Sequence, residues 1–200
     1  GYSFYSGWNS NYVPGGYKYG IIKSKREVRP FEEGRNVMYV QKSIRYVTEW
    51  MLERSPWSSE MDPRRVYVTG GSMGGSGSLA LAVHHPDLIA AANAFLQRTV
   101  IYWEGAYARN SQRMFGSVEM NVPMPNGESI WEHMDIASYL RRNPDREYPP
   151  IRLYNGRKDT TVKWTSHPDM YRAAQEAGLY VVVHWDEGDH NSRDPLAGFP

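Results

Sequence analysis

The chain has 200 residues, enough for one domain with a sizeable core, and its 40% hydrophobic and 22% charged content excludes a wholly disordered protein. Lys and Arg number 23 against 22 Asp and Glu, and this balance argues against a nucleic-acid or membrane-surface partner, since such proteins carry a basic stripe. The absence of Cys excludes disulfides, zinc–thiolate sites and a cysteine nucleophile, and no apolar run has the length of a membrane span.

Residues 1–30 are rich in Gly, Tyr, Ser and Asn and show no sustained period, so we expect irregular structure with a turn at 12–16. They contain no charged-then-apolar leader, and the sequence assigns no compartment. An amphipathic helix follows Pro30 and ends near Ser55-Pro56, because apolar side chains recur at three- and four-residue steps. These side chains are Val37, Val40, Ile44, Val47 and Met51.

Four short runs that are β-branched, aromatic or continuously apolar predict strands: 65–69, 88–95, 151–154 and 180–185. Helices are predicted from Ser72 to about His84, before Pro86, and from near Ser166 to Gly178. Strands that alternate with helices form βαβ units, and such apolar strands predict a mostly parallel sheet with helices on both faces. We therefore expect a single α/β domain over 1–200.

The segment 97–149 is too long for a simple crossover between the second and third strands, so we expect it to carry its own helices, one around 130–141. It is rich in aromatic residues and Met. One interpretation is a second layer of the core, and the other is a cap over an acyl or alcohol pocket. The side chains concerned are Tyr102, Trp103, Tyr107, Met114, Phe115, Met120, Met124, Trp131, Met134 and Tyr139.

The strongest motif is Gly70-Gly71-Ser72-Met73-Gly74, which fits G-x-S-x-G between a predicted strand and a predicted helix. A strand-to-helix turn of this kind strains the serine backbone and presents the hydroxyl at the carboxyl edge of the sheet. The amide of Met73, at the helix N-terminus, is the candidate donor to a developing oxyanion. The motif predicts that Ser72 is a nucleophile rather than a helix cap.

A serine nucleophile needs a base, and the base needs an orienting carboxylate. Asp159 follows the third predicted strand and His190 follows the fourth. Because the carboxyl ends of parallel strands meet at one edge of a sheet, we expect both side chains to lie near Ser72. Asp186 and Asp189 are weaker candidates for the acid.

Three blocks of the sequence resemble the α/β-hydrolase superfamily, in its esterase branch near polyhydroxybutyrate depolymerases and prolyl-oligopeptidase-like hydrolases. The first block, 64–75, contains the strand-to-helix turn at Ser72, which we call the elbow. The second, 155–162, contains Asp159, and the third is Gly-Asp-His at 188–190. The resemblance implies that Ser72 is the nucleophile, Asp159 the acid and His190 the general base. It implies no cofactor and no metal.

Members of that superfamily have several strands before the elbow strand, one of which leads into an oxyanion loop, often with His-Gly. Residues 1–64 contain no His-Gly and no convincing pair of such strands. The chain therefore resembles the C-terminal part of a longer hydrolase. An uncovered strand edge seeks a partner, so we expect a companion chain or a missing N-terminal segment to complete the sheet.

These observations favour a serine hydrolase that cleaves a carboxylic ester through an acyl-enzyme, on a small-molecule or polymer-derived substrate. The 14% aromatic content suggests ring-bearing substrates. A prolyl-oligopeptidase-like peptidase is the first alternative, because those enzymes share the elbow and the order of the three residues. The second is a non-catalytic module that binds a carbohydrate or a peptide.

Two other patterns are weaker. Residues 75–80 fit a G-x-G-x-x-A dinucleotide signature, but no acidic residue ends the next predicted strand, and no Gly-Lys-Ser/Thr follows for a phosphate loop. His84 and His85 are adjacent and so do not share a helix face, which argues against a metal site. We expect them to mark a helix C-terminus, where positive charge is favourable, and His133 to be a helix-face residue without a role.

Overall fold

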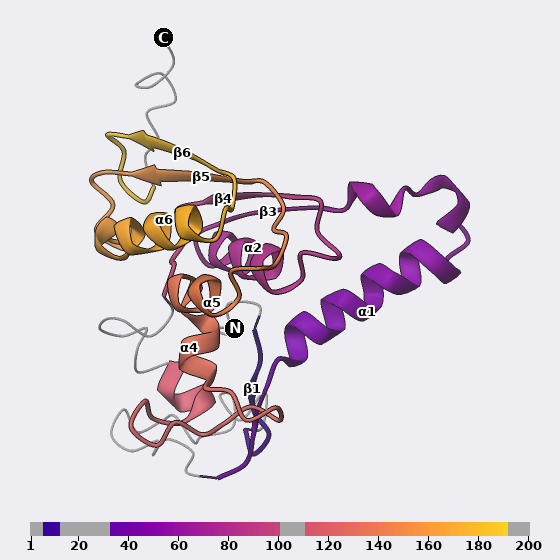
Figure 1. Ribbon diagram of the computed structural model, residues 1–200, viewed down its shortest axis with the longest axis horizontal. Coiled ribbons are helices and arrows are strands. Elements are labelled where there is room, and N and C mark those ends of the chain that lie inside the picture. The colour runs from indigo at the N-terminus through magenta and orange to yellow at the C-terminus, as the bar shows by residue number, and fades with distance from the viewer. Residues whose placement is uncertain (1–5, 13–32, 101–110, 192–200) are drawn as a thin grey trace.

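A computed structural model describes residues 6–12, 33–100 and 111–191 of the chain (Figure 1). Turn 12–16, apart from Tyr12, lies outside these residues. The strands are β1 (Trp8–Asn9), β2 (Asn36–Val37), β3 (Tyr67–Gly71), β4 (Ala91–Phe95), β5 (Ile151–Gly156) and β6 (Val181–Asp186). The helices are α1 (Tyr39–Arg54), α2 (Met73–His84), α4 (Ile130–Met134), α5 (Ile136–Arg142) and α6 (His167–Glu176), with 3-10 turns η1 (Ser58–Glu60), η2 (Pro63–Arg65) and η3 (Trp164–Ser166).

The main sheet has four strands in the order β3-β4-β5-β6, and every pair is parallel. The strand order is also the chain order. Neighbouring strands are parallel because each connection crosses back over the sheet before the next strand begins. The predicted parallel α/β fold is confirmed. Its consequence is that the loops after β3, β5 and β6 leave from the same edge of the sheet.

One face of this sheet carries the core. Helices α2, α5 and α6 lie on that face (Figure 1), and their apolar side chains share one cluster with inward-facing strand residues such as Ala92 and Leu153. On the opposite face Tyr67 is 64% exposed and Val182 45% exposed. Among the described residues, the expected cover of helices on both faces is therefore found on one face only. β3 alternates between exposed and partly buried positions, and in β6 only Asp186 is buried.

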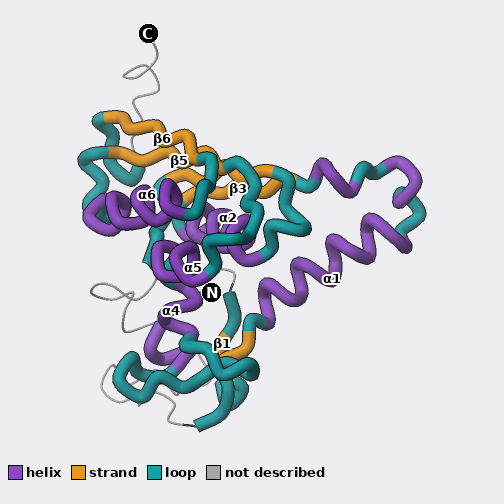
Figure 2. The backbone as a smooth tube through the Cα atoms, viewed as in Figure 1, coloured by secondary structure: helices purple, strands orange, loops and turns teal. Residues whose placement is uncertain are grey.

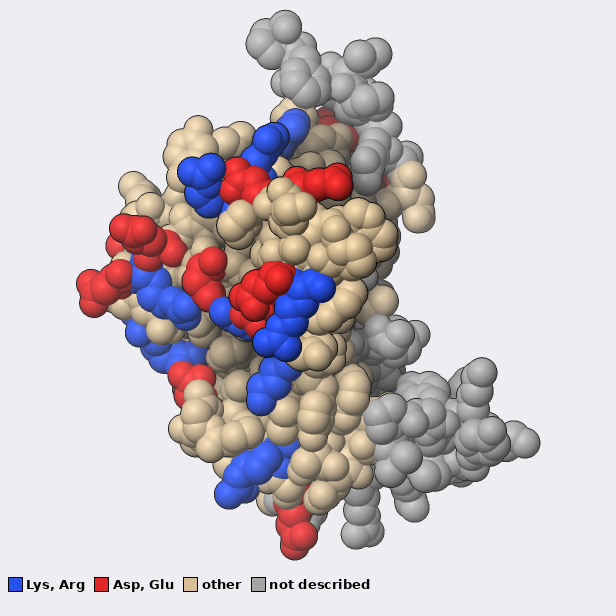
Figure 3. Space-filling model, turned by 90° about the vertical axis from the view of Figure 1, so that its right-hand side faces the viewer, with Lys and Arg blue, Asp and Glu red and all other residues tan. Residues whose placement is uncertain are grey.

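Helix α1 has the predicted apolar side chains at three- and four-residue steps, but it extends away from the sheet (Figure 2) and does not lie along it. Its start is tied to α2 by Gln41, whereas Val47 and Trp50 farther along are exposed. On the side of the molecule toward which α1 points, Lys and Arg alternate with Asp and Glu (Figure 3). This mixture agrees with the balanced composition and forms no single-sign stripe there.

Element boundaries differ from expectation at two predicted strands. β4 begins at Ala91 rather than at residue 88, because the amides of Leu88 and Ile89 turn back to the His85 carbonyl. Both side chains are buried in this turn, which explains the continuous apolar run. β3 begins at Tyr67 rather than at residue 65, because Asp62 caps the 3-10 turn η2 just before it.

The single helix expected around 130–141 is two helices, α4 and α5, separated at Asp135. This residue is extended, with φ −85° and ψ 106°, and its carboxylate accepts a hydrogen bond from the Ser138 amide to cap α5. Most of the expected aromatic and Met side chains in the described part of segment 97–149 join the main core, as a second core layer requires: Met114, Phe115, Met124, Trp131, Met134 and Tyr139. Met120 does not, because it is 49% exposed, and Tyr102, Trp103 and Tyr107 lie outside the described residues. The role of this segment as a cap over a pocket stays a prediction.

Burial keeps three histidines neutral: His84 and His167 are buried, and His133 is largely buried. His84 lies between Gln41 and the His133 carbonyl, with its ring 4.2 Å from the His133 ring. Burial lowers the pKa of His84 well below its ordinary value, and it lowers the pKa of His133 and of His167 to about 4. His84 and His85 mark the C-terminus of α2, as expected. The expected positive charge there is contradicted, because burial lowers the pKa of both histidines.

We expect the stability to fall as the pH drops from 6.5 toward 4. The unfolded chain protonates these histidines near pH 6.5, whereas the folded protein takes up a proton at His133 and His167 only near 4. Above pH 6.5 both histidines are neutral in the folded and the unfolded protein, so their protonation does not lower the stability. At pH 5 protonation in the unfolded state lowers the free energy of unfolding by up to about 2 kcal/mol for each histidine. Urea unfolding at pH 7.5 and 5 measures this loss.

The variants His133→Gln and His167→Gln isolate the histidine contribution, because nearly all carboxylates keep their surroundings; the exception is Glu128, which lies 3.4 Å from His133 and whose pKa is already below its ordinary value. Each variant is expected to lose less stability between the two pH values than the wild type. Equal losses in all three would show that these imidazoles do not control the acid response.

Candidate active site

Ser72 lies at the turn between β3 and α2 with φ +55° and ψ −116°. A positive φ is unfavourable for a side-chain-bearing residue and persists only where the surroundings impose it. Here the Ser72 amide donates to the Phe95 carbonyl at 2.8 Å, and its own carbonyl accepts from the Ser76 amide at 2.9 Å. The Ser76 hydroxyl donates to the same carbonyl and accepts from the Arg98 amide, which ties the elbow to the loop after β4.

Glycines allow the strand and helix to approach closely at this turn. A Cβ atom on Gly70 would overlap the Gly74 backbone, and one on Gly75 would overlap the Phe95 carbonyl. By contrast, a Cβ on Gly71 would have no atom within 4 Å. Backbone packing therefore requires glycine at the first position of the motif, Gly70, and at Gly75 just after it, whereas it does not require glycine at Gly71.

Asp159 follows β5 and is held by the chain that comes after it. Its Oδ1 accepts hydrogen bonds from the amides of Thr161 and Val162, both at 2.8 Å. Its Oδ2 lies 2.7 Å from His190 Nδ1, and the side chain is 2% exposed. One carboxylate oxygen is thus fixed by backbone, which directs the other toward the imidazole.

His190 follows β6 and bridges the acid and the serine. Its Nε2 lies 2.8 Å from Ser72 Oγ, and its side chain is 17% exposed. The ionised Asp159 carboxylate only accepts hydrogen bonds, so Nδ1 carries the proton. In the neutral ring Nε2 is then the acceptor for the Ser72 hydroxyl, the arrangement that allows proton removal from serine. The structure therefore brings all three predicted residues together.

The loops that carry Asp159 and His190 are joined by their backbones. The Lys158 amide donates to the Gly188 carbonyl at 3.0 Å, and a Cβ on Gly156 would overlap that same carbonyl. The Gly188 amide in turn donates to Asp186. Sequence reasoning missed this contact between the loops, although its signal was visible: Gly156 ends β5, and Gly188 lies two residues after the end of β6.

The weaker candidates for the acid have other partners. Asp186 is buried and accepts hydrogen bonds from the Tyr154 hydroxyl and the Gly188 amide. Asp189 accepts from the Asn191 amide at 2.7 Å. Both carboxylates thus shape the loop before the base, and the geometry favours Asp159 as the partner of His190.

Met73 is the first residue of α2, so its amide is among those that have no acceptor within the helix. It directly follows Ser72, and its role as oxyanion donor stays a prediction. Within residues 6–12, 33–100 and 111–191, no group of three or more His, Asp or Glu is arranged to hold a metal ion. No helix in these ranges is both long and apolar enough to cross a membrane.

Solved structures share this fold at low sequence identity. A putative dipeptidyl aminopeptidase IV from Bacteroides ovatus matches with TM-score 0.59 and 20% identity over 79% of this chain and 20% of its own. An S-formylglutathione hydrolase from Agrobacterium tumefaciens matches with TM-score 0.58 and 17% identity over 77% of this chain and 50% of its own. An acylaminoacyl peptidase from Pyrococcus horikoshii matches with TM-score 0.58 and 15% identity over 76% of this chain and 24% of its own. The chain thus spans half or less of the length of these proteins.

No curated protein sequence gives a significant match to the chain. The sequence profile of the prolyl oligopeptidase family matches residues 39–197, which include α1, the elbow and both loops that carry Asp159 and His190. The resemblance to α/β-hydrolases is confirmed, and the four-stranded sheet is part of such a domain. The chain belongs to the prolyl oligopeptidase family of serine hydrolases.

Proposed function

We propose that this chain carries the catalytic centre of a serine peptidase that cleaves its substrate through an acyl-enzyme. The observation that carries the proposal is the continuous hydrogen-bonded path from Ser72 Oγ to His190 and on to Asp159, at 2.8 and 2.7 Å. The family match supports a peptide substrate, as do two neighbours described as an aminopeptidase and an acylaminoacyl peptidase. The peptidase alternative is therefore better supported than the ester substrate that the sequence favoured.

The geometry supports the following steps. His190 Nε2 removes the Ser72 proton as Oγ attacks the substrate carbonyl, and Asp159 stabilises the imidazolium that forms. The Met73 amide, at the positive end of α2, donates to the oxyanion. The imidazolium then protonates the leaving nitrogen, the C–N bond breaks, and water hydrolyses the acyl-enzyme by the same route.

Ester cleavage is the second candidate, supported by the S-formylglutathione hydrolase among the structural neighbours. The serine, base and acid have the same tasks for either substrate. The difference lies in the leaving group, because an amine must be protonated before it departs, whereas an alcohol leaves more readily. The triad alone therefore does not separate the two substrates.

We also propose that a further segment, on this chain or on a companion chain, pairs with β3. Among the described strands β3 is an edge of the sheet, and unpaired strand edges recruit partners. Tyr67 on β3 and Val47 on α1 are exposed and line the same hollow at this edge. Such a segment is the natural place for groups that bind the substrate on the far side of Ser72.

A fluorophosphonate probe is expected to label Ser72, because His190 makes its hydroxyl nucleophilic. Ser72→Ala abolishes the adduct, and Asp159→Asn slows labelling by about 10³ to 10⁴-fold through loss of the correct imidazole tautomer. Peptide mass spectrometry locates the adduct. Ser43→Ala, an exposed serine on α1, is the matched control and should label at the wild-type rate. An adduct on another serine would contradict the assignment.

The elbow glycines give a second test. Gly70→Ala forces a Cβ into the Gly74 backbone, so we expect a loss of about 2–4 kcal/mol of stability and at least about 100-fold slower labelling of Ser72. Gly71→Ala, with no atom within 4 Å, should keep the labelling rate within about twofold. Equal behaviour of the two variants would mean that the close strand–helix approach does not hold the nucleophile.

Substrate class is tested by comparing an aminoacyl-proline p-nitroanilide with p-nitrophenyl acetate. We expect hydrolysis of both, with amide turnover lost in Ser72→Ala and in His190→Gln, since the leaving aniline nitrogen needs the proton from His190. Turnover of the ester alone, by a protein that is fully labelled at Ser72, would favour the esterase candidate.

A further inference from the structure

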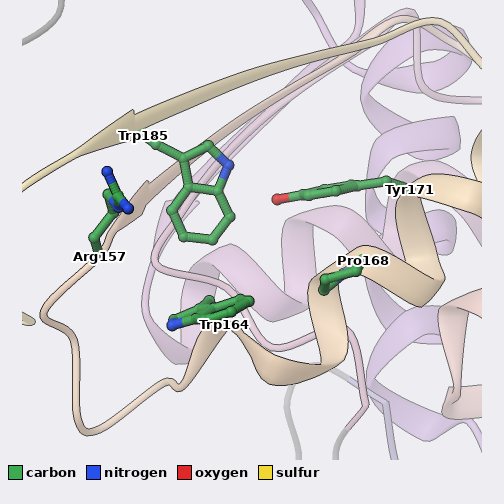
Figure 4. A pocket seen from close by; sticks show the side chains of 5 residues that line it. All are labelled: Arg157, Trp164, Pro168, Tyr171 and Trp185. Atoms are coloured by element: carbon green, nitrogen blue, oxygen red, sulfur yellow. The ribbon is translucent and has the colours of Figure 1, made fainter.

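A second pocket lies outside the triad, between η3, α6 and the edge strand β6 (Figure 4). Its volume is about 530 Å³, within the range of small-molecule sites, and it is lined by Arg157, Trp164, Pro168, Tyr171 and Trp185. Three of these five side chains are aromatic rings and one is the proline ring. None of the five is a residue of the proposed catalytic centre, so the pocket has no task in the mechanism above.

The ring walls of this pocket are held in place. The Trp185 ring lies 5.7 Å from the buried His167 ring and 6.5 Å from the Tyr171 ring, both in edge-to-face geometry. Trp164, on the 3-10 turn η3, is 50% exposed, and Figure 4 shows its ring across the hollow from Trp185. The pocket therefore offers a braced indole and an accessible indole, surfaces on which a flat ring stacks without much ordering of the protein.

Polar groups lie at the base and at the mouth. The Tyr171 hydroxyl is buried and has no hydrogen-bond partner within the described ranges, and Figure 4 shows it pointing toward Trp185. Burial raises the pKa of Tyr171, so this group is a neutral hydroxyl. At the mouth the exposed Arg157 guanidinium pairs with Glu187 at 3.1 Å. A buried hydroxyl without a partner is unfavourable, and a ligand oxygen would relieve it once a small shift of the surrounding side chains opens the hydroxyl to the pocket.

These groups narrow the chemical class of the ligand. A cation is disfavoured because Arg157 lies at the mouth and Lys158 lies 3.9 Å from Glu187, and an anion finds both of these positive groups already paired with the Glu187 carboxylate. A proline-rich peptide offers rings and carbonyl acceptors, but its prolines have no N–H to donate to Glu187. A sugar ring has apolar C–H faces for the indoles and hydroxyls that both donate and accept.

We propose that this pocket is a binding site for a neutral sugar ring, stacked on Trp164 against Trp185, with hydroxyls bonded to the Arg157–Glu187 pair and to Tyr171. This site is independent of the proposed peptidase activity. It lies on the same two loops as the triad, since Trp164 is two residues beyond Val162 and Glu187 is three residues before His190. A hydrolase with such a site would hold a sugar-bearing substrate or surface beside its catalytic edge.

The test uses the full wild-type chain labelled with ¹⁵N, titrated with maltose, cellobiose and N,N′-diacetylchitobiose. We expect at least one disaccharide to shift the indole N–H signals of Trp164 and Trp185 in a saturable manner. The signal of Trp57, which is 54% exposed elsewhere on the surface, should not move. Trp164→Ala should weaken binding at least about tenfold, whereas the matched variant Trp57→Ala should bind like the wild type.

Because Trp164 is no part of the triad, the Trp164→Ala variant should keep the wild-type rate of fluorophosphonate labelling, which also shows that it is folded. Absence of a saturable shift with all three disaccharides would overturn the proposal. So would shifts of the same two indoles by a hexaproline peptide with none by the sugars, because the pocket would then be a peptide site. Sugar binding that moves Trp57 but not Trp164 would overturn it as well.

Discussion

The site depends first on how closely β3 and α2 approach one another. At Gly70 and Gly75 the backbones of strand, helix and β4 leave no room for a Cβ atom, and this contact places Ser72 in its strained conformation. The strain is maintained by the hydrogen bonds of the Ser72 amide and carbonyl, and by Ser76, which joins the helix to the loop after β4. A larger residue at either glycine would separate the elements, and the hydroxyl would leave the sheet edge.

The second constraint is the parallel sheet itself. Since all four strands run the same way, the loops after β5 and β6 leave from the edge at which the elbow lies. Backbone bonds between these two loops, with Gly156 against Gly188, set the separation of Asp159 and His190. The imidazole is thus positioned by groups that never touch a substrate, so the acid and base are in place before one binds.

Sequence alone predicted the four strands of the main sheet, the helix after Ser72 and the three residues that meet at the edge, because each residue lies in a turn or loop that follows a strand. It did not predict the short strands β1 and β2. Nor did it predict the break at Asp135, whose carboxylate caps the N-terminus of α5. In the sequence this residue fits the polar face of a continuous helix, so nothing there marks it as a cap. The burial of His84 between Gln41 and His133 was also missed, since it depends on contacts between residues more than forty positions apart. The sequence also did not show that, in the described residues, helices cover only one face of the sheet. The strands are rich in β-branched residues and so appear apolar on both faces, although Val182 is exposed.

The arrangement separates the chemistry of this protein from the choice of its substrate. The proposed nucleophile, base and acid all follow β3 or strands on one side of it, and the proposed steps use them in the same way for an amide and for an ester. A substrate bound at Ser72 must also be contacted from the other side of β3, which is a free edge among the described strands. Members of one fold can therefore keep the same three side chains and change substrate through the segment that lies beyond that edge. The peptidases and the S-formylglutathione hydrolase that share this fold are consistent with such a division.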